Sequence, residues 1–142
     1  MNARRLLTLD ATVDWFETLT PETVARIEAI YAADAFFKDP FNEVRGVPAI
    51  RRIFEHMFVQ VKNPRFHITE RWEHERGAAL LWDFTFEAGG RTQTVRGASH
   101  LQLAPDGRIA HHRDYWDAAE ELYEKVPVLG ALMRAIKRRL AA

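Results

Sequence analysis

The sequence predicts an α+β domain in which helices cover one face of a strongly curved antiparallel sheet. In the first half, apolar residues recur at helical spacing, whereas the second half alternates apolar and polar residues. The length of 142 residues suits one domain with one hydrophobic core. Bulky aromatic residues fall on one face of the predicted strands, so we expect a cone that encloses an apolar pocket.

Three helices are predicted before the strands begin. The first, residues 11–19, is a short amphipathic segment. The second, residues 20–35, starts with Thr20 as its cap and Pro21 at the first helical position. The third, residues 47–61, carries a continuous apolar stripe that includes Phe54 and Phe58.

Four antiparallel strands are predicted in the second half, at residues 65–75, 79–88, 91–103 and 108–116. Gly89-Gly90 supplies a tight hairpin turn between the second and the third. Alternation puts one set of residues on a single face of each of these strands: Leu80, Trp82, Phe84 and Phe86 in the second, and Val95, Gly97, Ser99, Leu101 and Leu103 in the third.

We predict one domain over residues 1–118, followed by a helical extension over residues 119–142. This helix is amphipathic, with four basic residues on one side. We expect it to pack on its own domain or across a dimer. The alternative is a peripheral position on a membrane surface.

Composition narrows the classes of partner and chemistry. The formal net charge is zero, which argues against a nucleic-acid partner. The chain contains no cysteine, so disulfides and thiolate chemistry are excluded. No apolar run approaches the roughly 20 residues of a membrane-spanning helix. The N-terminal residues lack the apolar core of a signal peptide, so we expect a cytoplasmic protein.

Asp39 lies inside the aromatic run FFKDPF. The following Pro40 holds the Asp39 backbone extended, which limits where the side chain points. Aromatic neighbours would desolvate the carboxylate and make it a stronger base, which predicts a catalytic role. The alternative is a turn in which the carboxylate accepts local backbone hydrogen bonds.

The last predicted strand contains a second cluster, HHRDYW. Alternation places His112, Asp114 and Trp116 on one face, and the residue pattern leaves open which face is inside. His112 and Asp114 could orient each other as an acid–base pair, or form part of a salt-bridge ladder on the sheet. Their spacing does not favour a metal site.

The segment IYAADAFFKDPFNEVRG, followed by a helix, four strands, DGRI and YW, resembles the nuclear transport factor 2 / ketosteroid isomerase superfamily. Within it, residues 10–118 are most similar to SnoaL-like proteins. The resemblance implies a cystatin-like, ketosteroid-isomerase-like cone and a homodimer that pairs through the outer sheet faces. This fold hosts many reactions as well as non-catalytic binding domains, so it implies no single activity.

The resemblance also implies roles for single residues. Asp39 matches the position of the isomerase general base, and Trp15 and Ser99 stand where the isomerase has its two oxyanion donors. His112, Asp114 and Trp116 match pocket-facing positions on the last strand.

We therefore predict an enzyme that uses no cofactor and applies acid–base chemistry of the isomerase or cyclase type to a small hydrophobic carbonyl compound. The alternative is a non-catalytic module of the same fold that binds a ligand or a protein. The predicted catalytic residues are Asp39, His112, Asp114 and Ser99. The predicted pocket wall consists of Trp15, Phe54, Phe58, Trp82, Phe84, Phe86 and Trp116.

Overall fold

The computed structural model describes residues 6–121 and 127–141. Its elements occur in two groups along the chain. The N-terminal group consists of α1 (Leu9–Glu17), α2 (Pro21–Val24), a short 3₁₀ helix (Ile27–Ala29), β1 (Tyr31–Lys38), β2 (Glu43–Arg45) and α3 (Val47–Gln60). The second group consists of β3 (Lys62–His74), β4 (Gly77–Ala88), β5 (Arg91–Leu103), β6 (Ile109–Tyr115), α4 (Ala118–Glu121) and α5 (Pro127–Leu140).

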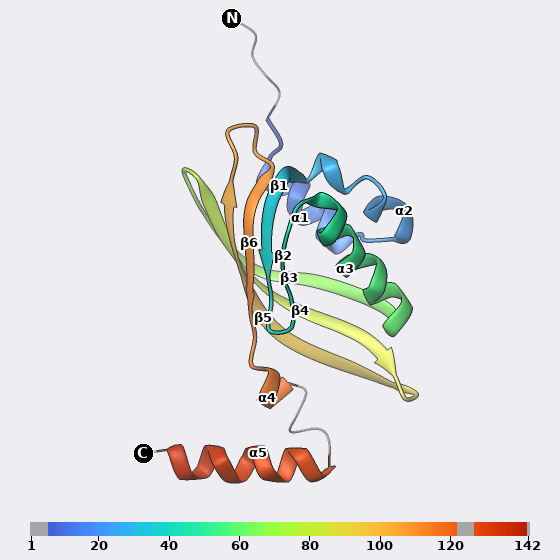
Figure 1. Cartoon of the computed structure of the whole chain (residues 1–142), viewed down its shortest axis with the longest axis vertical. Helices are drawn as coiled ribbons and strands as arrows, with labels where there is room; N and C mark the ends of the chain where they lie inside the picture. The colour runs from blue at the N-terminus through green and yellow to red at the C-terminus, as the bar shows by residue number, and fades with distance from the viewer. Residues whose placement is uncertain (1–5, 122–126, 142) are drawn as a thin grey trace, which may run out of the picture.

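The strands form one mixed sheet in the order β2-β1-β6-β5-β4-β3. All neighbours are antiparallel except β1 and β6, which run parallel. Figure 1 shows that the sheet curves strongly and that α1, α2 and α3 lie on one side of it. The four strands predicted for the second half are confirmed, and the two-residue turn at Gly89-Gly90 has positive φ at both residues, as a tight hairpin requires.

The prediction of a four-stranded sheet under three complete helices is wrong at residues 30–45. The expected second helix stops at residue 29, and β1 follows it. A break in the pairing of β1 with β6, between Tyr31 and Phe36, interrupts the two-residue alternation. Ala32 is therefore buried and Ala33 exposed, against strict alternation from Tyr31, and pairing with two strands overrides the helical preference of the alanines.

A second irregularity changes which face β3 presents. Phe66 and Ile68 point toward the interior, as alternation predicts. The register with β4 shifts between Ile68 and Glu70, after which Trp72 pairs with Ala79 and is 53% exposed. Trp72 therefore lies on the outer face, although strict alternation places it inside.

The C-terminal helix forms as α5, with Leu132, Ile136 and Leu140 exposed. The side chains of residues 122–131 lie outside the described residues, so the predicted packing of this helix stays a prediction. Within the described residues, no helix is long and apolar enough to cross a membrane.

His111 lies on the outer face of β6, where its ring stacks on Phe36 at 4.9 Å between centroids. Burial lowers the pKa of His111, and neighbouring positive groups lower it further. Those groups are His100, His112, Arg113 and Arg45. The Nδ1 atom of His111 is buried and has no hydrogen-bond partner among the described residues, so the folded chain has a second reason to keep this ring uncharged.

We expect acid to destabilise the protein through His111. The unfolded chain takes up the proton near pH 6.5, before the folded chain does, so stability falls as the pH drops through that value toward the lower folded-state value. His111→Phe keeps a ring against Phe36 and removes the titration. The free energy of unfolding of the wild type should therefore fall relative to that of the variant as the pH is lowered through about 6.5. Urea denaturation of both proteins measures this difference, and a difference independent of pH would contradict the expectation.

Candidate functional site

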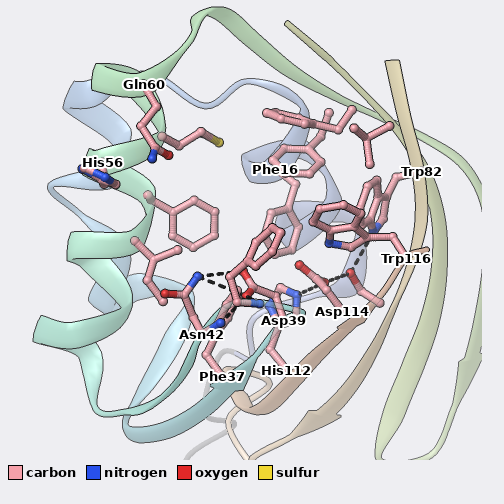
Figure 2. A pocket seen from close by; sticks show the side chains of 18 of the residues that line it. Phe16, Phe37, Asp39, Asn42, His56, Gln60, Trp82, His112, Asp114 and Trp116 are labelled. Carbon is pink, nitrogen blue, oxygen red and sulfur yellow. Dashed lines mark hydrogen bonds and ion pairs between the residues drawn. The ribbon is translucent and has the colours of Figure 1, made fainter. Parts of the chain in front are cut away.

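A cavity of about 540 Å³ lies between α3 and the inner face of the sheet. Its size is in the range of sites for small organic ligands, and its wall is mainly aromatic and aliphatic. Figure 2 shows side chains from α3, from the loop after β1 and from the sheet converging on this space. The predicted site residues that line it are Asp39, Phe54, Trp82, Phe84, Phe86, Ser99, His112, Asp114 and Trp116.

Trp15 and Phe58 do not line this cavity, so their assignment to its wall is wrong. Trp15 packs edge-on against Phe16 and Phe54, and its indole N–H donates to the Thr23 carbonyl at 3.2 Å. Phe16, the next residue of α1, takes the place in the wall. Phe58 lies on a different side of α3, where it lines a shallow depression together with Pro64.

The structure resolves the register of β6 that the residue pattern leaves open. His112, Asp114 and Trp116 point into the cavity, and His111 and Tyr115 point to the outer face. Ser99 of β5 is the register partner of Asp114, so both side chains share the inner face.

Four side chains form a continuous hydrogen-bond network around Asp114 (Figure 2). The Trp82 indole N–H donates to Ser99 Oγ at 2.9 Å, and Ser99 Oγ donates to Asp114 Oδ1 at 2.5 Å. His112 Nε2 lies 2.6 Å from the same Asp114 oxygen. Trp82, Ser99 and His112 are each at most 5% exposed, so water competes little for these bonds.

Tyr31 and Asp114 pair with the two ring nitrogens of His112. Its hydroxyl lies 2.7 Å from His112 Nδ1, and its ring is fully buried. Burial raises the pKa of Tyr31 well above its usual value, with a further contribution from the negative charge of Asp114. Tyr31 therefore stays protonated, and its hydroxyl can donate. Because the Asp114 carboxylate only accepts, the proton of a neutral His112 lies on Nε2, and Nδ1 accepts from the Tyr31 hydroxyl.

Asp114 keeps one carboxylate oxygen available to the cavity. Oδ1 accepts from both Ser99 and His112, while Oδ2 has no hydrogen-bond partner among the described residues and is not enclosed by protein. The indole N–H of Trp116, two residues further on, also lines the cavity and makes no hydrogen bond with the described residues. An acceptor and a donor therefore face the same apolar space (Figure 2).

Asp39 has a different environment. Its Oδ1 accepts from the backbone N–H of Phe41 at 2.8 Å and of Asn42 at 2.6 Å, and the Asn42 side-chain amide reaches both carboxylate oxygens at 3.1 Å. These bonds form the turn that connects β1 to β2. These contacts match the alternative interpretation of Asp39, a turn in which the carboxylate accepts local hydrogen bonds. Asp39 borders the cavity, but the donors of the turn already bind its carboxylate.

The two positions that correspond to isomerase oxyanion donors are also occupied. The Trp15 N–H is bonded to Thr23, away from the cavity. The hydroxyl proton of Ser99 is directed to Asp114, because the Trp82 N–H already donates to the Ser99 oxygen. Among the described residues, no group of three or more histidine and acidic side chains is placed to hold a metal ion.

Several functional groups escape prediction from the sequence. Tyr31 belongs to a segment whose spacing indicates a helix, so nothing in the sequence indicates that it contacts His112. Asn42 follows Asp39 by three residues, the spacing at which a side chain can complete an Asp turn. The polar residues Arg52, His56 and Gln60 of α3 line the cavity, and their spacing of four places them on one stripe of that helix.

These features define a class of protein: a curved-sheet cone with an apolar cavity and a buried polar network at its inner wall. The sequence profile of the SnoaL-like domain matches residues 12–112. The chain therefore belongs to the SnoaL-like family, as the sequence motifs predict. A search of curated proteins finds no match.

Solved structures confirm the nuclear transport factor 2 / ketosteroid isomerase fold. A hypothetical protein of ketosteroid isomerase-like fold from Catenulispora acidiphila, in complex with trimethylamine, is similar with a TM-score of 0.68 and 16% identity, covering 80% of this chain and 88% of that one. A putative isomerase of the SnoaL-like family from Agrobacterium tumefaciens has a TM-score of 0.64 and 18% identity, with coverages of 80% and 97%. TerC, co-crystallised with polyporic acid, has a TM-score of 0.66 and 15% identity, with coverages of 79% and 90%.

Proposed function

We propose that the protein is a cofactor-independent acid–base enzyme of the isomerase or cyclase type, acting on a hydrophobic carbonyl compound. One observation carries this proposal. In the wall of an apolar cavity, Asp114 has one oxygen held by His112 and Ser99 and the other oxygen without a partner among the described residues. A carboxylate placed in this way can accept a proton from a bound ligand.

The proposed step is proton abstraction from a carbon next to the ligand carbonyl. The proton moves to Asp114 Oδ2, and the electrons of the C–H bond pass to the carbonyl oxygen, which becomes an enolate. The Trp116 N–H is the available donor for that oxygen. In a ligand with a carbon–carbon double bond β,γ to the carbonyl, return of the proton at the far end of the conjugated enolate completes an isomerisation. In a cyclisation, the enolate carbon attacks a second carbonyl of the ligand, and the alkoxide that forms takes the proton back from Asp114.

Ser99, His112 and Tyr31 serve this step as positioning residues. Ser99 and the Nε2–H of His112 hold Asp114 Oδ1, which directs Oδ2 toward the ligand. Tyr31 pairs with Nδ1 of His112 and so holds the ring whose Nε2–H donates to Asp114. Asp39 shapes the loop at the edge of the cavity instead of acting as the base.

The comparisons support an apolar ligand of this kind only by analogy. One neighbour of the same fold is named a putative isomerase, and another was crystallised with polyporic acid. The alternative function is a non-catalytic module that binds a hydrophobic ligand. The hydrogen bonds that occupy Asp39, Trp15 and Ser99 favour it, because they remove the donors and the base of a steroid isomerase.

Deuterium exchange tests the proposal without knowledge of the natural substrate. A panel of cyclic ketones and 1,3-diketones is incubated with the protein in deuterated buffer, and loss of the α-proton signals is followed by NMR. A base in an apolar cavity should accelerate exchange of at least one compound that fits it. If compounds bind in the cavity but none exchanges faster than in buffer, the catalytic proposal fails and the binding module remains.

Tyr31→Phe should remove the hydrogen bond at His112 Nδ1 while leaving the fold intact. The proton of His112 should stay on Nε2, because the Asp114 carboxylate still accepts it. The ¹⁵N shift of Nδ1 should therefore move toward that of an acceptor nitrogen without a hydrogen bond, and the Nε2–H signal should remain. Unchanged shifts in Tyr31→Phe would contradict the role assigned to Tyr31.

A further inference from the structure

One side of the cavity carries a basic group that the proposed reaction does not use. Arg52, His56 and Gln60 follow one another at spacings of four along α3, so they form a single polar stripe on that helix. All three are exposed to solvent and line the cavity. Figure 2 shows His56 and Gln60 on the α3 side, across from Trp82 and Trp116 of the sheet side.

Arg52 has no partner of opposite charge among the described residues. Its neighbour in the sequence, Arg51, points elsewhere and pairs with Glu28 at 2.6 Å. Arg52 forms neither an ion pair nor a hydrogen bond in the described chain, although it borders a mainly apolar cavity. A guanidinium in that position has all its donors available for a ligand.

From this arrangement we infer that the cavity selects ligands that carry an anionic oxygen group on a hydrophobic ring system, and that Arg52 binds this group. The inference rests on the proposed function and adds the class of substrate. Guanidinium binds carboxylate and related anions through paired, charge-assisted hydrogen bonds. His56 and Gln60, one and two turns further along α3, extend the polar edge against which the same group can lie.

The charges of the cavity also orient such a ligand. Asp114 on β6 carries the free carboxylate oxygen, which repels an anion. The anionic end of the ligand therefore lies toward Arg52 on α3, and the uncharged carbonyl end lies toward Asp114. Ile53 and Met57 of α3 and Phe84 of β4 supply the apolar wall between these groups.

Two fluorescent probes that differ by one sulfonate group test the inference. The anionic probe is 8-anilinonaphthalene-1-sulfonate, and the neutral probe is N-phenyl-1-naphthylamine, which lacks the sulfonate. Arg52→Gln should weaken binding of the anionic probe about tenfold and change the neutral probe less than about twofold, because it removes a charged hydrogen bond and little apolar surface. Arg51→Gln is the matched control, since it removes the same charge from the adjacent residue, and it should leave both affinities unchanged.

Met57→Trp, which fills the cavity from the same helix, distinguishes a failure of the proposed function from a failure of the role of Arg52. If it weakens both probes, the probes occupy the cavity. With cavity binding established in this way, equal effects of Arg52→Gln on the two probes, or no effect on either, would overturn the role of Arg52 and leave the proposed function standing. Failure of both probes to bind, or binding that Met57→Trp does not weaken, would overturn the proposed function and this inference with it. Melting temperatures of the variants verify that each one is folded.

Discussion

Asp114→Asn should reduce proton exchange of a bound ketone by at least about a hundredfold, the lower end of what general base catalysis contributes. The amide keeps the shape of the side chain and can still accept from Ser99 and His112 through its oxygen. It cannot take a proton at the atom that faces the ligand. Ligand affinity should change little, because the apolar wall is untouched. NMR exchange rates and probe titrations on the same samples measure the two effects separately.

Asp39→Asn is the matched control for this substitution. It makes the same chemical change at the other carboxylate that borders the cavity. The oxygen of the new side-chain amide can still accept the backbone N–H bonds of the turn, and the Asn42 amide can rotate to pair with it. We expect less than about a tenfold loss of exchange, well below the range for a general base. A larger loss in Asp39→Asn than in Asp114→Asn would restore Asp39 as the base, as the resemblance to ketosteroid isomerase implies.

Gly97→Ala should destabilise the protein by about 1–3 kcal/mol, the usual cost of forcing an extra methyl group into a packed core. A Cβ atom on Gly97 would lie 2.4 Å from Cη2 and 2.6 Å from Cζ2 of the Trp82 ring, far inside contact distance. Trp82 is its register partner on β4 and is 5% exposed, so the ring has little room to withdraw. Displacement of the indole would also break its bond to Ser99. Urea denaturation followed by circular dichroism measures the loss.

A double-mutant cycle identifies the cause of that loss. Trp82→Phe removes the ring atoms that the new methyl group would meet. In this background, Gly97→Ala should cost much less than in the wild type, because the steric conflict is gone. Equal costs in both backgrounds would show that the backbone at Gly97, and not the packing of Trp82, requires glycine.

The sequence by itself determined the family and the architecture of the second half of the chain. Apolar alternation and turn residues are local signals, and they correctly placed β3 to β6, the Gly89-Gly90 hairpin and the inward face formed by Trp82, Phe84 and Phe86. The signals that predicted α3, its length and its apolar stripe, were equally local. Motif spacing then linked these elements to SnoaL-like proteins.

Only the tertiary structure decided where the chemistry lies. β1 was not predictable, because its strand conformation depends on pairing with β6, more than 70 residues away, and a break in that pairing disguises its alternation. Tyr31 reaches His112 only through this pairing. Asp39 and Asp114 are both acidic residues near aromatic side chains in the sequence. The hydrogen bonds in three dimensions distinguish them, since local backbone donors occupy Asp39 whereas side chains from β5 and β6 leave one oxygen of Asp114 facing the cavity.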